Sequence, residues 1–519
     1  MVEQAARRMA EEIVRFAPGG WTRALLSGHA GDGGSGMTGG YTVSGGHGSP
    51  DFPELHPLLE QLAEAVHAER GWERIRWEMD CRNTGAYTLV TFTEEIGRIL
   101  EPAGGYQIEL DPSYRLPQAG MRQEAGTAAP AGDPDLATAT FRTYLERRAA
   151  VLGHQEELPP PVTAAQLDDA ERRIGHPLPA DLRALYLSAD GDGIGYRHRL
   201  LIENNAWLSL ESLVAEYTEE QEWGTRPWYG WDLEWDAVVF DGTPPDTVRR
   251  CGGHPGWIRF ATSEDGNYLA VDMAPARDGR PGQVIATGRD YDEGPVYVAD
   301  SLTSLLQRHV ELLEQGSYEV YDGHISLSRE DEDPGEVQII GQIPAEVPPS
   351  LQAIHINNAT GPVDLAPLTA APRLRRLHLN RSVAADLAPV RELPVESLRI
   401  ALDGGDLTPL EAHPHLSSLA LDTTAPTDLS PLLTVPNLRG LDLSGCEAVD
   451  LTVLVNLPGL RYLALDRQQW AALLDHGKVP PVLAAARLAG ADVTYEDALA
   501  LAARLGLATD GALRVAGRL

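Results

Sequence analysis

The chain has 519 residues, of which 43% are hydrophobic and 23% are charged, the proportions of a folded globular protein rather than a disordered one. At about 100–200 residues per domain, this length predicts about three or four domains. Lysine and arginine number 42 against 76 aspartates and glutamates, so the net charge is −34. Because binding to a phosphate backbone draws on basic side chains, this charge disfavours nucleic acid and anionic membranes and favours a basic protein as partner.

Cysteine usage and hydropathy narrow the class of protein further. Cys81, Cys251 and Cys446 lie far apart, which excludes a disulfide framework and a paired-cysteine metal site. No apolar run reaches the roughly 18–20 residues that a membrane span needs, and residues 1–16 lack the apolar core of a secretory signal. We therefore expect a cytoplasmic protein.

The first block, residues 1–118, is predicted to be an α+β domain. Helical spacing of apolar residues covers 2–16 and 53–68. The stretch 28–48 is so rich in glycine that we expect long hairpin loops around a short strand at 41–43. Small and polar residues at 119–135 predict a linker.

The second block, residues 136–318, also predicts an α+β domain. A helix at 136–152 is followed by a capping box, in which Thr163 and Gln166 open the next helix. The pair Asp190-Gly191 is typical of a helix end. Strand-like runs follow, and a helix at 302–313 closes the block.

The third block, residues 337–466, is a repeat. Asp-Leu recurs at 364, 386, 406, 428 and 450, and proline follows in every copy except the last. An apolar ladder such as LRRLHL at 374–379 follows each turn, and this pattern is the signature of leucine-rich repeats. We expect an α/β solenoid in which aspartate caps each short helical turn, and residues 467–519 as a helical C-terminal cap.

No pattern of residues predicts a catalytic, cofactor or metal site. The segment 189–195 (ADGDGIG) lacks the glutamate of a calcium loop and the lysine of a phosphate loop, so it is read as a helix end and turn. His29 and His47 lie in the glycine-rich stretch without the spacing of ligands. We expect no cofactor and no catalytic residue.

The constellation richest in candidate binding residues is residues 207–240, which hold five of the ten tryptophans and many acids. Tryptophan and tyrosine supply anchors at protein interfaces, and carboxylates select a cationic partner. The same rings could instead fill a core; we expect Trp207 in the core and the Trp223–Trp235 loop partly exposed. The candidate protein-binding residues are Trp223, Trp228, Tyr229, Trp231, Trp235, Glu219, Glu220, Glu222, Asp232, Glu234 and Asp236.

The repeat offers a second candidate surface. Side chains between the ladder leucines are expected to face outward on the sheet, where they could contact a protein. These residues are Arg376, His378, Ser418, Ala420, Arg439, Asp442, Tyr462 and Ala464.

Residues 160–315 resemble the SMI1/KNR4 (SUKH) superfamily. The residues that carry the resemblance are the helix at 163–174, Leu178-Pro179, Asp181-Leu182, Leu185-Tyr186, Asp190-Gly191, Trp207-Leu208, Leu210, Trp257-Ile258, Asp265-Gly266-Asn267, Leu269, Asp272 and Gly282–Val284. The resemblance implies an α+β fold. Bacterial members of the family are mostly immunity proteins that neutralise toxins, and fungal members regulate cell-wall synthesis. The N-terminal block is similar to YezG-like immunity proteins through Trp21, Gly39–Tyr41, Trp77 and Gly85–Tyr87.

These observations favour a multidomain, non-enzymatic binder. The main hypothesis is a bacterial immunity protein (antitoxin) that binds and neutralises a basic toxin. The alternatives are a regulatory scaffold of the cell-wall-assembly type, or an enzyme whose site lies in the glycine-rich N-terminal domain. The sequence leaves the partner and the oligomeric state open.

Overall fold

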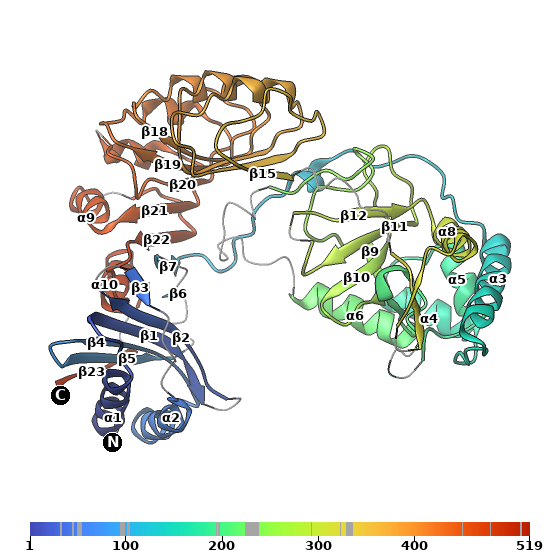
Figure 1. The fold of residues 1–519 in the computed structure, drawn as a ribbon, viewed down its shortest axis with the longest axis horizontal. Coiled ribbons are helices and arrows are strands. Elements are labelled where there is room, and N and C mark those ends of the chain that lie inside the picture. Colours follow the sequence, from blue (N-terminus) through green and yellow to red (C-terminus); the bar gives the residue numbers. More distant parts are fainter. Residues whose placement is uncertain are drawn as a thin grey trace. The chain divides into compact units, whose positions relative to one another are not determined.

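The computed structural model describes every residue except 32–33, 44–45, 49–53, 94–98, 101–103, 194, 196–197, 224–237, 292, 322, 329–335, 449, 478 and 509–510. The chain divides into two compact units (Figure 1). The first unit comprises Met1–Pro112, Leu402–Ala412 and Leu419–Leu519, and the second comprises Ser113–Ala401 and His413–Ser418. Among the described residues, no helix is both long and apolar enough to cross a bilayer.

The first unit contains an antiparallel sheet with two helices on one face. The helices are α1 (Val2–Arg15) and α2 (His56–Arg70). The strands, in sheet order, are β23 (Leu513–Arg518), β5 (Ala86–Phe92), β4 (Arg74–Arg82), β1 (Trp21–Gly31), β2 (Gly36–Val43) and β3 (Gly46–Gly48). Met9 and Ile13 of α1 and Trp77 of β4 are buried in the core between helices and sheet. This arrangement agrees with the predicted α+β class.

The glycine-rich stretch forms longer strands than the sequence predicts. A Cβ on Gly28 of β1 would lie 2.0 Å from the carbonyl oxygen of Gly36, and one on Gly39 of β2 would lie 2.2 Å from that of Leu25. Gly39 also has a φ of +129°, which side chains rarely adopt. The glycines therefore serve close approach of paired strands, and the expectation of long hairpin loops was wrong for β1 and β2.

The C-terminal segment belongs to the same unit and is only partly helical. Its helices are α9 (Arg467–Asp475) and α10 (Tyr495–Arg504). Strand β22 (Ala485–Ala489) pairs in parallel with β21 (Tyr462–Asp466), and β23 pairs with β5 in the N-terminal sheet. The prediction of a purely helical cap was wrong, because β22 extends the repeat sheet.

Strands from the N-terminal block continue this sheet. Strand β7 (Gly105–Glu109) pairs antiparallel with β22, and β6 (Ile99–Leu100) pairs with β7. Tyr495 at the start of α10 stacks on Phe92 of β5, with ring centroids 4.1 Å apart. The two ends of the chain therefore fold together within the first unit.

The second unit contains an α+β domain, residues 134–326, which we term the central domain. Its helices are α3 (Pro134–Leu152), α4 (Ala164–Ile174), α5 (Ala180–Tyr186), α6 (Leu210–Trp223) and α8 (Leu302–Gln315). Its antiparallel sheet has the order β12 (Val296–Ala299), β11 (Gln283–Gly288), β10 (Asn267–Asp272), β9 (Trp257–Thr262) and β8 (Ala206–Trp207). A hairpin of β13 (Glu319–Tyr321) and β14 (His324–Ser326) follows α8.

Local sequence signals explain the helix boundaries of this domain. The Thr163 hydroxyl accepts from the Gln166 backbone N–H (3.3 Å), and the Thr163 N–H donates to the Gln166 side chain (2.8 Å). The predicted capping box is therefore confirmed. Gly175 ends α4 in the left-handed conformation, with a φ of +79°.

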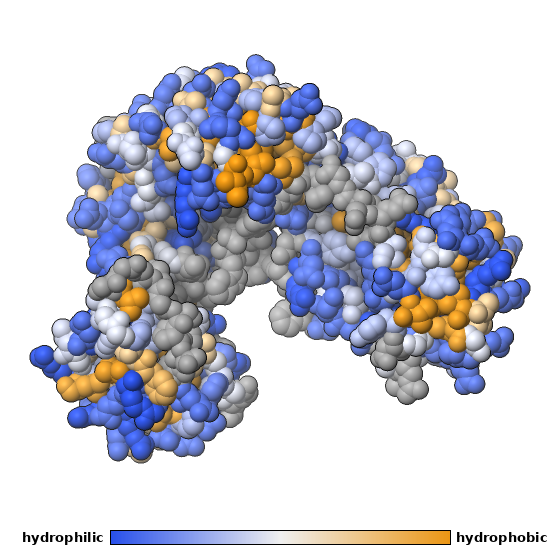
Figure 2. Space-filling model, in the orientation of Figure 1, coloured by the Kyte–Doolittle hydropathy of each residue, from blue (hydrophilic) through white to orange (hydrophobic). Residues whose placement is uncertain are grey.

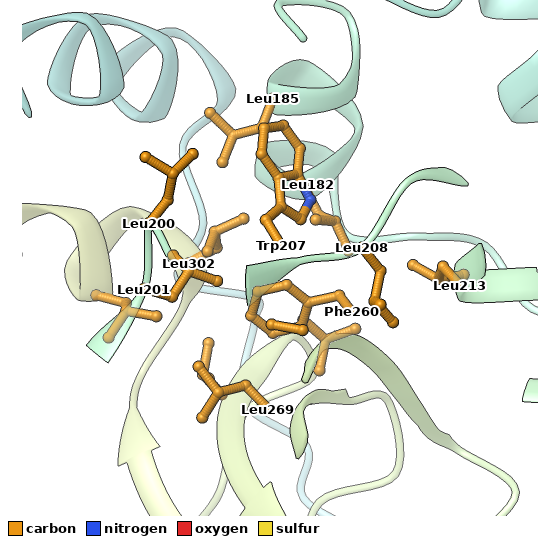
Figure 3. Close-up of a cluster of buried hydrophobic side chains, with 14 of the residues drawn as sticks. Leu182, Leu185, Leu200, Leu201, Trp207, Leu208, Leu213, Phe260, Leu269 and Leu302 are labelled. Atoms are coloured by element: carbon orange, nitrogen blue, oxygen red, sulfur yellow. The ribbon is translucent and has the colours of Figure 1, made fainter. Parts of the chain in front are cut away.

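The core of the central domain lies where helices meet the sheet. Figure 3 shows Leu182 and Leu185 of α5 beside Trp207, with Phe260 of β9 below it. Trp207 is only 3% exposed, so its predicted core position is confirmed.

The repeat block alternates short strands with 3-10 helices. In the second unit, β15 (Glu336–Ile340), β16 (Ala353–Asn357) and β17 (Arg376–Ala384) pair in parallel, and β18 (Ser397–Leu402) follows in the sheet order. In the first unit, β20 (Gly440–Asp442), β21 and β22 pair in parallel. Strand β19 (Ser418–Thr423) precedes β20 in that order.

The recurring aspartates cap the 3-10 helices as predicted. Each carboxylate accepts from the backbone N–H two residues later, over 2.7–2.9 Å, and this holds at 364, 386, 406, 428 and 450. In the last three copies a hydroxyl at the same position also donates to the carboxylate, which lowers the pKa of Asp406, Asp428 and Asp450. This hydrogen bond therefore recurs once in each repeat, at the spacing of the Asp-Leu pairs in the sequence.

Candidate protein-binding site

Helix α6 carries the start of the predicted aromatic and acidic constellation. Its first turn is capped twice, since the Leu210 N–H donates to the Asp190 carboxylate (2.7 Å) and the Ser212 N–H donates to the Ser209 hydroxyl (3.2 Å). Leu213 is buried in the core, which leaves the opposite side of the helix for polar residues.

Only part of the predicted site falls in the described chain. Glu219 is exposed on α6. Trp223, Glu220 and Glu222 also lie in α6, but their side chains are outside the described residues, as are Trp228, Tyr229, Trp231, Trp235, Asp232, Glu234 and Asp236 altogether. The interface assignment for these residues stays a prediction.

One acidic residue at the start of helix α6 is paired with an arginine. Glu211 on α6 accepts two hydrogen bonds from Arg173 of α4, at 2.8 and 2.9 Å, and this hydrogen bonding lowers the pKa of Glu211. Glu219 lies two turns further along the helix. On the face drawn in Figure 2, hydrophilic residues cover most of the surface and hydrophobic ones gather in a few patches.

Helix α5 ends at Tyr186, before the segment 189–195, so the predicted helix end at Asp190-Gly191 was wrong, and the described residues of this segment form bends and a turn. Asp190 caps α6, and Gly191 has a φ of +78°. Asp192 is turned inward and is 2% exposed. Within the described chain, no group of three or more histidines, cysteines, aspartates or glutamates could hold a metal ion.

Beside this turn lies a buried ion network of Tyr144, Arg148, Glu156, Asp192 and His198, which sequence reasoning missed. Arg148 of α3 donates twice to the Glu156 carboxylate, at 2.7 Å each, and once to the Tyr144 hydroxyl (3.1 Å). It also donates to the His198 carbonyl oxygen (2.8 Å). Arg148 and Glu156 are 0% and 3% exposed at their side chains, so this ion pair is shielded from water.

Burial and hydrogen bonding shift the ionisation of this network in opposite directions. Burial alone would raise the pKa of Glu156, but hydrogen bonds from Arg148 and His198 outweigh it and lower the pKa to about 2. Burial raises the pKa of Asp192 to about 7, although His198 and backbone N–H groups act against it. The hydrogen bond to Glu156 raises the pKa of His198.

Asp192 predicts a pH-dependent stability. Its folded pKa of about 7 lies above the unfolded value of about 3.9, so the folded state binds more protons between these values and stability falls as pH rises from about 4 through 7. Asp192→Asn should therefore leave the melting temperature nearly unchanged at about pH 4, raise it progressively relative to wild type as pH rises, and give the full gain at about pH 8.

The measurement is the melting temperature of wild type and Asp192→Asn across this range. The raised pKa of His198 also causes a loss of stability as pH rises, and the charge of Asp192 contributes to that shift, so the difference between the two curves reports Asp192 together with its effect on His198. Asp169→Asn, at an exposed carboxylate paired with Arg172, is the control and should show no such difference. Parallel curves for Asp192→Asn and wild type would refute the assignment.

A second contact missed by sequence reasoning joins the central domain to the first repeat coils. Residues 238–242, which we term the strap, lie against a group of repeat residues, which we term the seat: Gln352, Ala353, Arg373 and Arg376. The Asp241 N–H donates to the Gln352 side-chain oxygen (2.8 Å), and the Gln352 amide donates to the Asp241 carbonyl oxygen (2.9 Å).

The side chains of the strap meet further seat residues. Arg373 pairs with the Asp241 carboxylate (3.3 Å), and the Arg376 guanidinium lies over the Phe240 ring, 5.0 Å from its centroid. Val238 and Phe240 pack on Ala353 in a small buried cluster. All these residues belong to the second unit.

Glu396 is the ionic centre beside the strap. Its carboxylate accepts two hydrogen bonds from Arg250 (2.7 and 2.8 Å) and one from Arg375 (2.8 Å). Arg250 also donates to the Val239 carbonyl oxygen (2.8 Å). Gln123 of the predicted linker accepts from the Arg250 N–H (2.8 Å), so this linker segment is packed on the domain rather than extended in solvent.

The repeat surface predicted to face outward is largely covered. Arg376 and His378 are 0% and 2% exposed, and Ser418, Tyr462 and Ala464 are buried as well. Ala420, Arg439 and Asp442 are half-buried. The prediction of an open row was wrong for the buried members; at Arg376 the strap and Glu293 supply the cover.

The N-terminal alternative, an enzyme site, predicts that His29 or His47 meets carboxylates in a cleft. His29 of β1 is exposed and lies opposite Gly36 of β2. The side chain of His47 lies outside the described residues. The alternative of an enzyme site at these histidines therefore stays a prediction.

Comparison with known proteins decides the identity of the central domain. A model of the SMI1/KNR4 family (SUKH-1) matches residues 161–308. Residues 161–308 form an SMI1/KNR4 domain. KNR4/SMI1 homolog 2 of Debaryomyces hansenii is 28% identical over 229 residues, 37% of this chain and 38% of that protein.

Further relatives of the SMI1/KNR4 domain carry names of regulators. The glucan synthesis regulatory protein of Neurospora crassa is 29% identical over 182 residues, 30% of this chain and 34% of that protein. The cell wall assembly regulator SMI1 of Saccharomyces cerevisiae is 35% identical over 79 residues, 15% of each chain. The chain thus spans well under half of each of these relatives.

These relatives overturn the antitoxin hypothesis. They are fungal proteins named as regulators of cell-wall assembly or glucan synthesis, so the reading of the chain as a bacterial immunity protein was wrong. The physical reason is that net charge governs how fast a cationic partner is met but does not identify it. The relatives are named as regulators and not as enzymes, which agrees with the non-enzyme prediction.

Two solved structures each match 22% of the chain. Internalin C2 of Listeria monocytogenes is 29% identical over 22% of this chain and 54% of that chain, with a TM-score of 0.20. Internalin InlF of the same organism is 20% identical over 22% of this chain and 50% of that chain, with a TM-score of 0.14.

Proposed function

We propose that the chain is a non-enzymatic scaffold of the cell-wall-regulator type, in which the SMI1/KNR4 domain binds a protein partner. The observation that carries the proposal is the match of residues 161–308 to a family whose fungal relatives are named as regulators. The packing of this domain on repeat coils within one unit adds support, because it joins two kinds of module on one chain.

We further propose that residues 337–466 are leucine-rich repeats forming a solenoid. The support is the parallel pairing of successive strands, the buried ladder leucines such as Leu377 and Leu379, and the aspartate cap that opens each 3-10 helix. Such coils present a sheet face that suits protein contacts.

The proposed partner is a basic protein that contacts the acidic and aromatic residues beyond Glu219. The support is the net charge of −34 and the exposed position of Glu219 on α6. Complementary charge raises the rate of encounter at low salt, and tryptophans supply the anchoring energy.

Trp228→Ala combined with Trp231→Ala is expected to weaken partner binding at least about tenfold without unfolding the chain. The measurement is retention of the partner from a lysate of the native host by the immobilised full chain, at low and high salt, followed by titration of the retained protein. The proposal also expects that protein to act in cell-wall assembly.

The matched control is Trp72→Ala, at a half-buried tryptophan of the N-terminal domain, which should leave retention unchanged. If the double variant unfolds, the rings are core and the interface assignment is wrong. If this chain proves to be an enzyme that supplies a small molecule to the retained protein, the proposal of a non-enzymatic scaffold is wrong.

A further inference from the structure

The strap and the seat meet through three different kinds of recognition. The Gln352 side-chain amide accepts a hydrogen bond from the Asp241 N–H and donates one to the Asp241 carbonyl oxygen, as a paired strand would. Arg373 forms an ion pair with the Asp241 carboxylate, and the Arg376 guanidinium forms a cation–π contact with the face of the Phe240 ring. Two consecutive residues are thus recognised by backbone, charge and aromatic ring together.

The seat is unusual for this chain because it is basic. Two of its four residues, Arg373 and Arg376, are arginines in a protein of net charge −34. In a molecule that is otherwise acidic, such a basic surface favours the binding of an anionic segment.

The contact is small compared with the cores that it joins. Its apolar part consists of Val238, Phe240 and Ala353, whereas the core of the SMI1/KNR4 domain is an extensive cluster of buried aliphatic and aromatic side chains. The remaining contacts are hydrogen bonds and ion pairs. Polar interfaces of limited size between domains of one chain resemble transient protein–protein interfaces.

We propose that the seat is a binding site for an extended protein segment in which an aromatic residue precedes an acidic one, and that the strap occupies it as an internal ligand until a partner displaces it. The partner is therefore a protein that carries this aromatic–acidic pair. This inference deepens the proposed scaffold function by giving it an autoinhibited state, and it rests on that function.

Displacement is tested with the full chain and a peptide. Phe240→Ala combined with Asp241→Lys removes the ring and places a cation against Arg373, so the strap should leave the seat. An acetylated, fluorescently labelled peptide of residues 238–243 (VVFDGT) is then titrated, with fluorescence anisotropy as the readout. Saturable binding is expected to the double variant, and no binding to wild type at the same concentrations.

Seat variants give the specificity control. Adding Gln352→Ala and Arg373→Ala to the double variant should weaken peptide binding at least about tenfold, because both the backbone and carboxylate contacts are lost. A peptide carrying lysine in place of Asp241 should be weakened similarly. A folded double variant that does not bind the peptide, or equal binding to wild type, would overturn the proposal.

Hydrogen exchange of wild type keeps the proposal testable if the double variant does not fold. The Asp241 N–H should exchange through a local opening, at least about tenfold faster than the paired amides of β10 such as Val271. Glu396→Gln should speed the hydrogen exchange of the strap amides without speeding that of the β10 amides. Equal protection of strap and β10 would refute an openable seat. The peptide experiment needs no natural partner, so its failure leaves the capture experiment on the scaffold function standing.

Discussion

Arg148→Met is expected to lower the free energy of unfolding of the central domain by about 3–5 kcal/mol. The substitution keeps an unbranched side chain but leaves the buried Glu156 carboxylate without the two hydrogen bonds from the Arg148 guanidinium that offset its desolvation. The His198 carbonyl oxygen and the Tyr144 hydroxyl also lose a donor. Urea titration followed by circular dichroism measures the change, and hydrogen exchange of residues 136–318 assigns the transition to this domain.

The preceding residue offers a matched control. Arg147 pairs with Glu314 at 2.9 Å, but the two side chains are 55% and 50% exposed. Arg147→Met should therefore cost about 0–1 kcal/mol. Arg148→Met with Glu156→Met should regain much of the loss, because no buried charge is left alone. An Arg148→Met variant no less stable than Arg147→Met would contradict the assignment of a buried ion pair.

Trp207→Ala is expected to destabilise the same domain by about 3–5 kcal/mol, since it opens a large cavity in the core. The indole contacts the rings of Phe141 and Tyr186, with centroids 5.7 and 5.0 Å away. Figure 3 shows it between α5 and Phe260. Thermal and urea denaturation measure the loss, and Trp207→Phe should recover part of it.

Trp228→Ala is the comparison within the same tryptophan-rich stretch. The sequence predicts that this ring binds a partner, so its loss should leave the free energy of unfolding within about 0.5 kcal/mol of wild type. The pair of variants separates a core tryptophan from an interface tryptophan. Equal destabilisation by both would show that the whole stretch is core.

Signals that span a few residues were predicted well. The Thr163–Gln166 capping box and the aspartate caps of the repeat are hydrogen bonds between near neighbours, so residue types at fixed spacing predict them. The apolar periodicity of 2–16 likewise predicted the helix α1 and its buried face. The resemblance to the SMI1/KNR4 family rests on such helix ends and strand cores, and the family match confirmed it.

Contacts between distant residues had no comparable signal. Arg250 and Glu396 are 146 positions apart, and Asp241 and Gln352 are 111 apart. Each pair consists of common residue types that occur many times in the sequence. Only the tertiary fold therefore determines which of them become partners. The aromatic and acidic constellation drew attention because it is unusual in composition, whereas Arg148 and Glu156 are ordinary in composition and are set apart only by burial.

The amino-acid sequence alone determined the local elements, the repeat and its caps, and the family of the central domain, because those depend on neighbours along the chain. Only the tertiary structure decided that β23 joins the N-terminal sheet, that an ion pair is buried beside Asp192, and that the strap covers the seat. The reason is physical: a side chain's exposure and charge environment depend on which distant segments exclude water from it, and no local pattern encodes that exclusion.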